Sequence, residues 1–210
     1  MHLADGVLST PVIITTAAVT AATLVYSAKG IKEEDVPKTS LLAGVFFAVS
    51  LISIPVGPSS IHPLFAGLLG VVLGRRAPLA LFVGLLLQAL LFQHGGLTTL
   101  GANTLMLSIP AIVASALFNV FGKINIFLKG ALIGGISVMI TVAILVILLA
   151  LTDIRFGQGS LSVINILVLG HLPLVAIEAA VTGSALQLIA RVKPEMLNKK
   201  NTVLMMVLQR

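Results

Sequence analysis

The sequence predicts an all-α membrane protein, a bundle of seven transmembrane helices. Hydrophobic residues make up 58% of the 210 residues and charged residues only 10%, whereas roughly 25% of a soluble domain is charged. Continuous apolar runs alternate with short polar, charged or glycine-containing breaks, the pattern of a polytopic helical protein. No hydrophilic stretch is long enough to bury a core of its own. We therefore expect one transmembrane domain over residues 1–210.

Seven apolar runs account for the predicted spans. The run at 61–74 would rise only about 21 Å as a helix, against a hydrocarbon core of about 30 Å. It should therefore begin inside the bilayer boundary. The runs cover residues 9–28, 40–56, 61–74, 77–93, 102–121, 129–152 and 161–190, so the bundle occupies residues 9–190.

Basic residues predict the orientation of the bundle. If the N-terminus is outside, the inner segments hold 12 of the 13 Lys and Arg residues, and only Arg155 falls on the outer side. This bias places the N-terminus outside and residues 191–210 in the cytoplasm as a basic tail. The excess of basic residues thus marks one side of a membrane and indicates no nucleic-acid partner.

Residues 1–8 form a separate outer segment. Ser9 or Thr10 followed by Pro11 is a typical helix start, so the first span begins there. Eight extended residues reach up to about 26 Å, and the Asp5-Gly6 pair favours a turn. We expect this segment to fold back and insert into the bundle.

Met1 and His2 offer three nitrogen donors if Met1 is retained. The terminal amine, the amide nitrogen between the residues and the His2 imidazole would close two small chelate rings and leave one in-plane position open. A square of nitrogen donors suits Ni(II) or Cu(II) better than Zn(II), which prefers a tetrahedron. The alternative is an ordinary Met-His start with no metal role.

Two further histidines fall on the same outer side. His62 lies in GPSSIHPLFAG, where Pro63 should start the short third helix. It is the candidate fourth nitrogen donor, with a loop histidine at the water interface as the alternative. His94 lies in the glycine-rich stretch LFQHGGLTTLGANTL. With Gln93 and Asn103, it would line the cavity or orient the ligands, unless this stretch is simply a polar outer loop.

His171 and Glu178 are ionisable residues inside the last predicted span. Such residues are expensive in a bilayer and are expected to have partners. Seven positions apart on a helix, they share a face but are separated by about 10 Å. A structural or coupling role is favoured over direct metal binding. No phosphate-binding loop or nucleophile–base motif is present, so we expect no ATP site in this chain and no enzymatic activity.

Four ordered motifs resemble the substrate-capture (S) component of nickel and cobalt energy-coupling factor (ECF) transporters. They are MHLADGVLS, SSIHPLFAGLLGVVLG, FQHGGLTTLGANTLM and HLPLVAIEA. The resemblance implies a seven-helix fold and a metal held by four nitrogens from Met1, His2 and His62. It also implies a prokaryotic plasma-membrane location and partner subunits. These are a transmembrane coupling (T) subunit, a pair of cytoplasmic ATPases and, in some systems, a small accessory membrane subunit.

These observations favour a subunit that captures Ni²⁺ or Co²⁺ at the outer face for ATP-driven uptake. Asp5 in the opening motif leans towards nickel, by resemblance to nickel-specific members of the family. The alternative is a self-sufficient secondary transporter or channel for a cation or small solute. Ion coupling usually needs buried carboxylates and inverted repeats, and only Glu178 lies deep in a predicted span.

Overall fold

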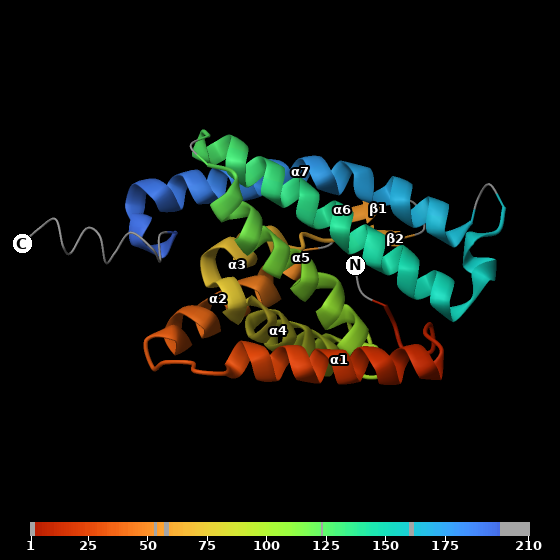
Figure 1. The fold of residues 1–210 in the computed structure, drawn as a ribbon. Helices are drawn as coiled ribbons and strands as arrows, with labels where there is room; N and C mark the ends of the chain where they lie inside the picture. The colour runs from red at the N-terminus through yellow and green to blue at the C-terminus, as the bar shows by residue number, and fades with distance from the viewer. Residues whose placement is uncertain (1–2, 53, 57–58, 123, 160–161, 198–210) are drawn as a thin grey trace, which may run out of the picture.

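The computed structural model describes residues 3–52, 54–56, 59–122, 124–159 and 162–197. Within these residues the chain forms seven α-helices and one short antiparallel hairpin (Figure 1). The helices are α1 (Thr10–Ala28), α2 (Asp35–Ser50), α3 (Ala66–Leu73), α4 (Ala77–Phe92), α5 (Leu100–Val120), α6 (Ile126–Thr152) and α7 (Val163–Val192). The hairpin pairs β1 (Ile54–Val56) with β2 (Ser59–Ile61).

Among the described residues, five helical segments are long and apolar enough to cross a membrane. They are α1, α5, α6, α7 and the continuous stretch Ala66–Phe92 that contains α3 and α4. Three of the seven predicted spans do not qualify separately. Helix α2 has 16 residues, while α3 with 8 and α4 with 16 count only as one continuous stretch. The multi-pass membrane character is thus confirmed, while the count of seven spans and the orientation remain predictions.

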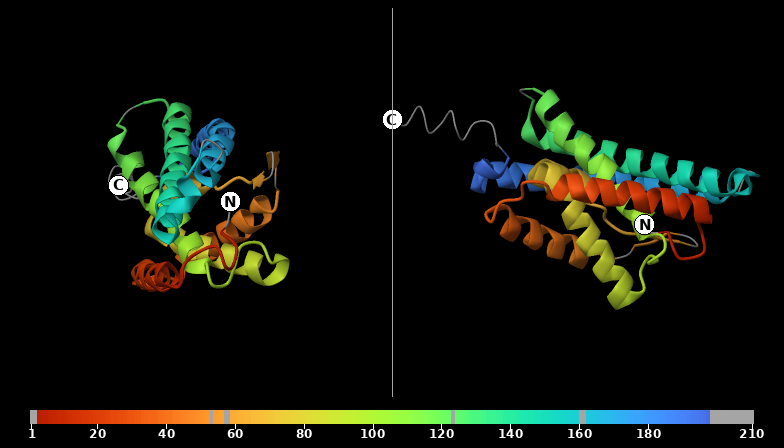
Figure 2. Two further views of the ribbon diagram at one scale, coloured as in Figure 1. Left: turned by 90° about the vertical axis from the view of Figure 1, so that its right-hand side faces the viewer. Right: turned by 60° about the horizontal axis from the view of Figure 1, so that its bottom comes forward.

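Helices α6 and α7 lie side by side along most of their length (Figures 1 and 2). Glycines allow this close approach. A Cβ atom on Gly134 would lie 2.5 Å from the carbonyl oxygen of Glu178, and one on Gly130 would lie 2.8 Å from the Cα of Gly183. Helix α5 contacts α1, α3, α4 and α6 and is the central element of the bundle.

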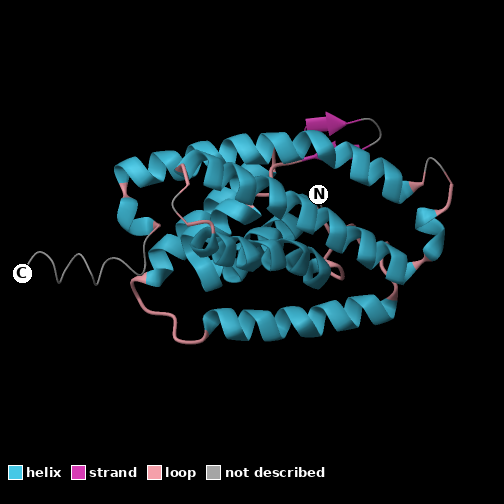
Figure 3. Cartoon of the chain, turned by 45° about the horizontal axis from the view of Figure 1, so that its top comes forward, coloured by secondary structure: helices cyan, strands magenta, loops and turns pink. Residues whose placement is uncertain are grey.

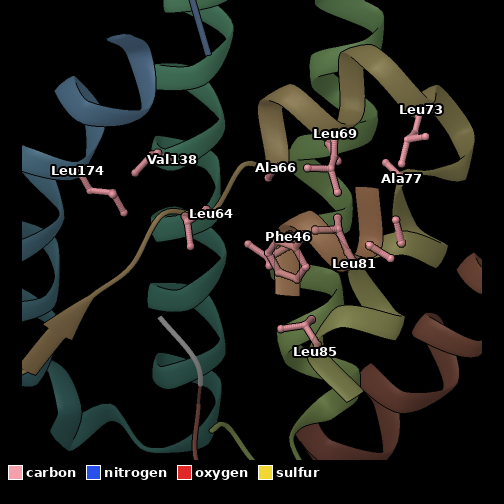
Figure 4. Close-up of a cluster of buried hydrophobic side chains, with 14 residues drawn as sticks. Phe46, Leu64, Ala66, Leu69, Leu73, Ala77, Leu81, Leu85, Val138 and Leu174 are labelled. Carbon is pink, nitrogen blue, oxygen red and sulfur yellow. The ribbon is translucent and has the colours of Figure 1, made fainter. Parts of the chain in front are cut away.

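Two buried clusters hold the outer elements onto α5 and α6. One contains Phe46, Leu64 and Leu81 and joins α2, the segment before α3, and α4 (Figure 4). The other buries Leu3 and Leu8 against residues of α5 and α6. The N-terminal segment, over its described residues 3–8, therefore inserts into the bundle as predicted.

The region between α2 and α3 differs from the prediction. The second predicted span, 40–56, ends its helix at Ser50, and Ile54–Val56 instead pair with Ser59–Ile61 in the hairpin (Figure 3). Pro55 excludes a helix that continues through residue 56, because it lacks an N–H for the helical ladder and would clash with the carbonyl of Leu51. Helix α3 begins at Ala66, not at Pro63 as predicted.

At one end of the bundle, Arg76 ties two connections together. Its buried guanidinium donates to the carbonyl oxygens of Ser27, Lys29 and Gly30 and pairs with Asp35 at 3.3 Å. The α1–α2 loop and the α3–α4 junction therefore lie at the same end. The basic residues of both connections predict that both lie on the inner side.

Candidate metal centre

The backbone of Leu3 is held by two buried polar side chains at the start of α5. Asn103 accepts from the Leu3 N–H through Oδ1 at 2.8 Å and donates to the Leu3 carbonyl through Nδ2 at 3.0 Å. The Thr99 hydroxyl donates to the same carbonyl at 2.6 Å. The backbone N–H and the carbonyl of Leu3 are thus both held by buried side chains. The first two predicted ligands, Met1 and His2, lie outside the described residues.

Asp5 fastens the same segment to the loop before α5. Its carboxylate accepts from the amide and the hydroxyl of Thr98, the former at 2.9 Å, and from the Leu97 amide at 3.3 Å. These hydrogen bonds, led by that of the Thr98 hydroxyl, hold the pKa of the Asp5 carboxyl below its usual 3.8. Gly96 leaves room for this contact, since a Cβ there would lie 2.1 Å from Asp5 Oδ1.

His62 is buried, with 1% of its surface exposed, just before the candidate span that starts at Ala66. The prediction that it is recessed is confirmed. Its Nδ1 contacts the Pro63 carbonyl at 3.2 Å; because a carbonyl only accepts, this contact favours the proton on Nδ1 and the lone pair on Nε2. Burial, with smaller contributions from His94 and His171, lowers the pKa of His62 to about 4. The imidazole is therefore neutral at pH 7, the form that binds a metal.

His94 connects the two halves of the candidate site. Its ring lies edge-on to the His62 ring, with centroids 5.8 Å apart. It belongs to the same loop that holds Asp5 through Leu97 and Thr98. This loop therefore contacts both the N-terminal segment and His62, which brings the two to one region of the protein.

Gln93 occupies a different environment from the other predicted cavity residues. It is exposed at the end of α4, in a left-handed conformation with φ of +52°. Its backbone N–H, like that of His94, is directed to the Gln88 carbonyl. Gln93 thus ends the helix, and the structure does not bring its side chain into contact with the buried residues of this region.

The two ionisable residues of α7 have separate environments. Glu178 accepts from the backbone amides of Leu64 and Phe65, the latter at 3.0 Å. His171 Nδ1 contacts the Leu167 carbonyl at 2.6 Å, and its buried Nε2 has no hydrogen-bond partner within the described residues. Glu178 thus has hydrogen-bond partners, as expected of an ionisable residue in a span. These donors could not be identified from the sequence, because they are backbone amides of two residues with apolar side chains.

Across the described parts of the chain, no group of three or more His, Cys, Asp or Glu side chains is arranged to hold a metal ion. The geometry instead supplies one neutral, buried imidazole, from His62, near an N-terminal segment fixed at Leu3 and Asp5. A metal site here would need further donors from the residues that precede Leu3.

The structure thus defines a multi-span helical membrane protein in which one loop contacts both a recessed imidazole, from His62, and an anchored N-terminal segment. The model of the CbiM family, "Cobalt uptake substrate-specific transmembrane region", matches residues 2–196. The chain therefore belongs to this family, a membrane component of cobalt and nickel transport.

Individual relatives agree with this assignment. The chain is 33% identical over 178 residues to the cobalt transport protein CbiM of Sorangium cellulosum, covering 80% of this chain and 78% of that protein. It is 31% identical over 143 residues to the fused nickel transport protein NikMN of Rhodobacter capsulatus, covering 64% of this chain and 39% of that longer protein. A crystal structure of a transition metal transporter has the same fold, with a TM-score of 0.80 at 24% identity, covering 91% of this chain and 93% of that one.

Proposed function

We propose that this chain binds Ni²⁺ or Co²⁺ with high affinity at the outer membrane face and delivers it inward as the substrate-specific subunit of an ATP-driven ECF transporter. The proposal depends on one observation: the loop 93–99 contacts two parts of the candidate site. His94 in this loop lies against the buried neutral His62, and Leu97 and Thr98 donate hydrogen bonds to Asp5 of the N-terminal segment. Residues 1 and 2 precede a backbone that is already fixed in this region.

The proposed site is a square of four nitrogens. The amine of Met1, the amide and imidazole nitrogens of His2 and the imidazole of His62 would supply them. His62 is already neutral at pH 7 because burial lowers its pKa to about 4, so binding need not displace a proton from it. Asn103 and Thr99 would hold the chelating segment in register through Leu3.

Nickel is the preferred cargo in this proposal. Four nitrogens in a plane suit Ni(II) because its d-electrons favour that geometry. Relatives named for nickel and for cobalt transport both match the chain, which agrees with a donor set that either ion fits. Asp5 favours nickel through the resemblance of its motif to nickel-specific members.

Delivery would require partners, because the sequence has no phosphate-binding loop. We expect a T subunit, a pair of cytoplasmic ATPases and, in some assemblies, a small accessory membrane subunit. The chain itself would be non-catalytic. Arg76, at the α3–α4 junction, binds the α1–α2 loop, so these two connections lie at the same end of the bundle. Both connections are rich in basic residues, which supports the prediction that this end faces the cytoplasm.

The test is a titration of purified protein with Ni²⁺ and Co²⁺ by calorimetry. His2→Ala and His62→Ala should each weaken binding by at least about 100-fold, since each removes a ligand, whereas His94→Ala should weaken it about 10-fold or less. Equal affinity of wild type and His62→Ala would contradict the proposal. Metal uptake into vesicles by the isolated chain, with no ATPase present, would favour the alternative of a self-sufficient secondary transporter.

A further inference from the structure

Glu178 is a buried acid that binds backbone rather than a cation. It lies in the middle of α7 with 2% of its surface exposed. One carboxylate oxygen, Oε1, accepts from the amides of Leu64 and Phe65. An ionisable residue at this depth is costly and needs such partners. Its hydrogen bonds fall on the segment that immediately follows His62.

That segment has a conformation that other contacts must maintain. Phe65 has φ of +48° and ψ of +13°, in the left-handed region. For a residue other than glycine, this conformation costs about 1 kcal/mol or more and persists only when surrounding structure imposes it. The Glu178 carboxylate supplies one such contact directly, at the Phe65 amide. Leu64 supplies another, since it packs with Val138 and Leu174 (Figure 4).

The backbone of α7 at Glu178 is held in place by close helix packing. A Cβ on Gly134 of α6 would lie 2.5 Å from the Glu178 carbonyl oxygen, and a Cβ on Gly67 of α3 would lie 3.3 Å from the Cα of Gly134. Helices α3, α6 and α7 therefore meet at Gly134. Little room is left for Glu178 to move relative to the amides it binds.

We propose that Glu178 is a positioning residue for His62: its carboxylate fixes residues 64 and 65 so that the His62 imidazole is aligned to complete the metal site. The inference rests on the proposed role of His62 as a ligand. Glu178 itself does not touch the metal. Removal of its acceptor should leave His62 present but misaligned.

Two variants of Glu178 distinguish the effect of its hydrogen-bond acceptor from the effect of its side-chain volume. Glu178→Met keeps a similar volume and removes the acceptor, so the amides of Leu64 and Phe65 lose their partner. Nickel affinity should fall about 10- to 100-fold, the usual effect of losing a contact that orients a ligand. Glu178→Gln keeps an uncharged oxygen acceptor, so its nickel affinity should fall by about fivefold or less. Leu186→Ala is the control, because it removes a buried side chain of α7 far from residues 62–65.

The decisive readout is the visible d–d absorption of the nickel-loaded proteins at saturating metal. With Glu178→Met, the spectrum should shift towards that of His62→Ala, while Leu186→Ala should lower the melting temperature and keep the wild-type spectrum. In combination with His62→Ala, Glu178→Met should cost little additional affinity, because both changes remove the same ligand.

A wild-type spectrum for Glu178→Met, with losses that add to those of His62→Ala, would overturn the inference and leave the proposed function intact. Wild-type nickel affinity for His62→Ala would instead overturn the proposed function, and the positioning role would fall with it. The single variant His62→Ala thus distinguishes the two failures.

Discussion

Asn103 binds both backbone groups of Leu3, accepting from its N–H at 2.8 Å and donating to its carbonyl at 3.0 Å. A side-chain amide carries an NH₂ donor and a carbonyl acceptor side by side, so it can pair with both backbone groups of one residue as a neighbouring β-strand does. Since both residues are buried, neither half of this contact is easily replaced by water. Asn103 thus fixes where the chain enters the bundle, one residue after His2.

Asn103→Ala should loosen this entry point and weaken Ni²⁺ binding by about 10- to 100-fold, because the chelating residues lose an anchor and the buried Leu3 N–H loses its acceptor. Calorimetric titration measures the effect. Asn119→Ala on the same helix is the control, since its exposed side chain contacts only the Ser115 carbonyl among the described residues. Equal losses in the two variants would argue against a specific role of Asn103.

Gly96→Ala should displace Asp5. The added Cβ would lie 2.1 Å from Asp5 Oδ1 and 2.6 Å from its backbone nitrogen, so the N-terminal segment must move. We expect a lower melting temperature and about 10-fold weaker Ni²⁺ binding. Gly44→Ala provides the matched control: nothing lies within 4 Å of its Cβ in helix α2, and alanine there should stabilise the helix by up to about 1 kcal/mol. Unchanged nickel affinity in Gly96→Ala would contradict the placement of Asp5.

The metal-free protein should lose stability in mild acid through His62. Burial lowers the folded pKa of His62 from 6.5 to about 4, so its neutral form stabilises the fold above pH 6.5. That contribution is lost as pH falls through 6.5 towards 4, by at most roughly 1.4 kcal/mol per pH unit. Thermal unfolding in chelator from pH 7.5 to 4 should show a steeper decline for wild type than for His62→Gln. Parallel curves would show that His62 is not buried as described.

Much of the fold could be predicted, because the composition indicates a membrane protein and the long apolar runs indicate where its helices lie. The runs 9–28, 102–121, 129–152 and 161–190 coincide within three residues at each end with α1, α5, α6 and α7. The region 50–66 could not be predicted. Its helix ends early at Ser50, and the start of α3 depends on Glu178, more than one hundred residues away in the chain. Local sequence has no access to such tertiary contacts.

The candidate site was partly accessible to the same reasoning. His62 is recessed as predicted. Asn103 hydrogen-bonds the N-terminal segment at Leu3, and its polar side chain in the glycine-rich stretch indicates such an orienting contact. Gln93 is next to His94 in sequence, which favours a place in the same cavity, yet the residue is exposed. Gly96 acts through the absence of a side chain, which only the packed structure makes visible.

The most direct test of metal capture is a paired Ni²⁺ titration of the protein with a free Met1 amine and of the same protein with one glycine added before Met1. The extension removes the terminal amine from the chelate and leaves His2, His62 and the bundle unchanged. We expect loss of the high-affinity site in the extended protein, with an unchanged melting temperature in the absence of metal. Equal affinity and stoichiometry in both proteins would contradict it.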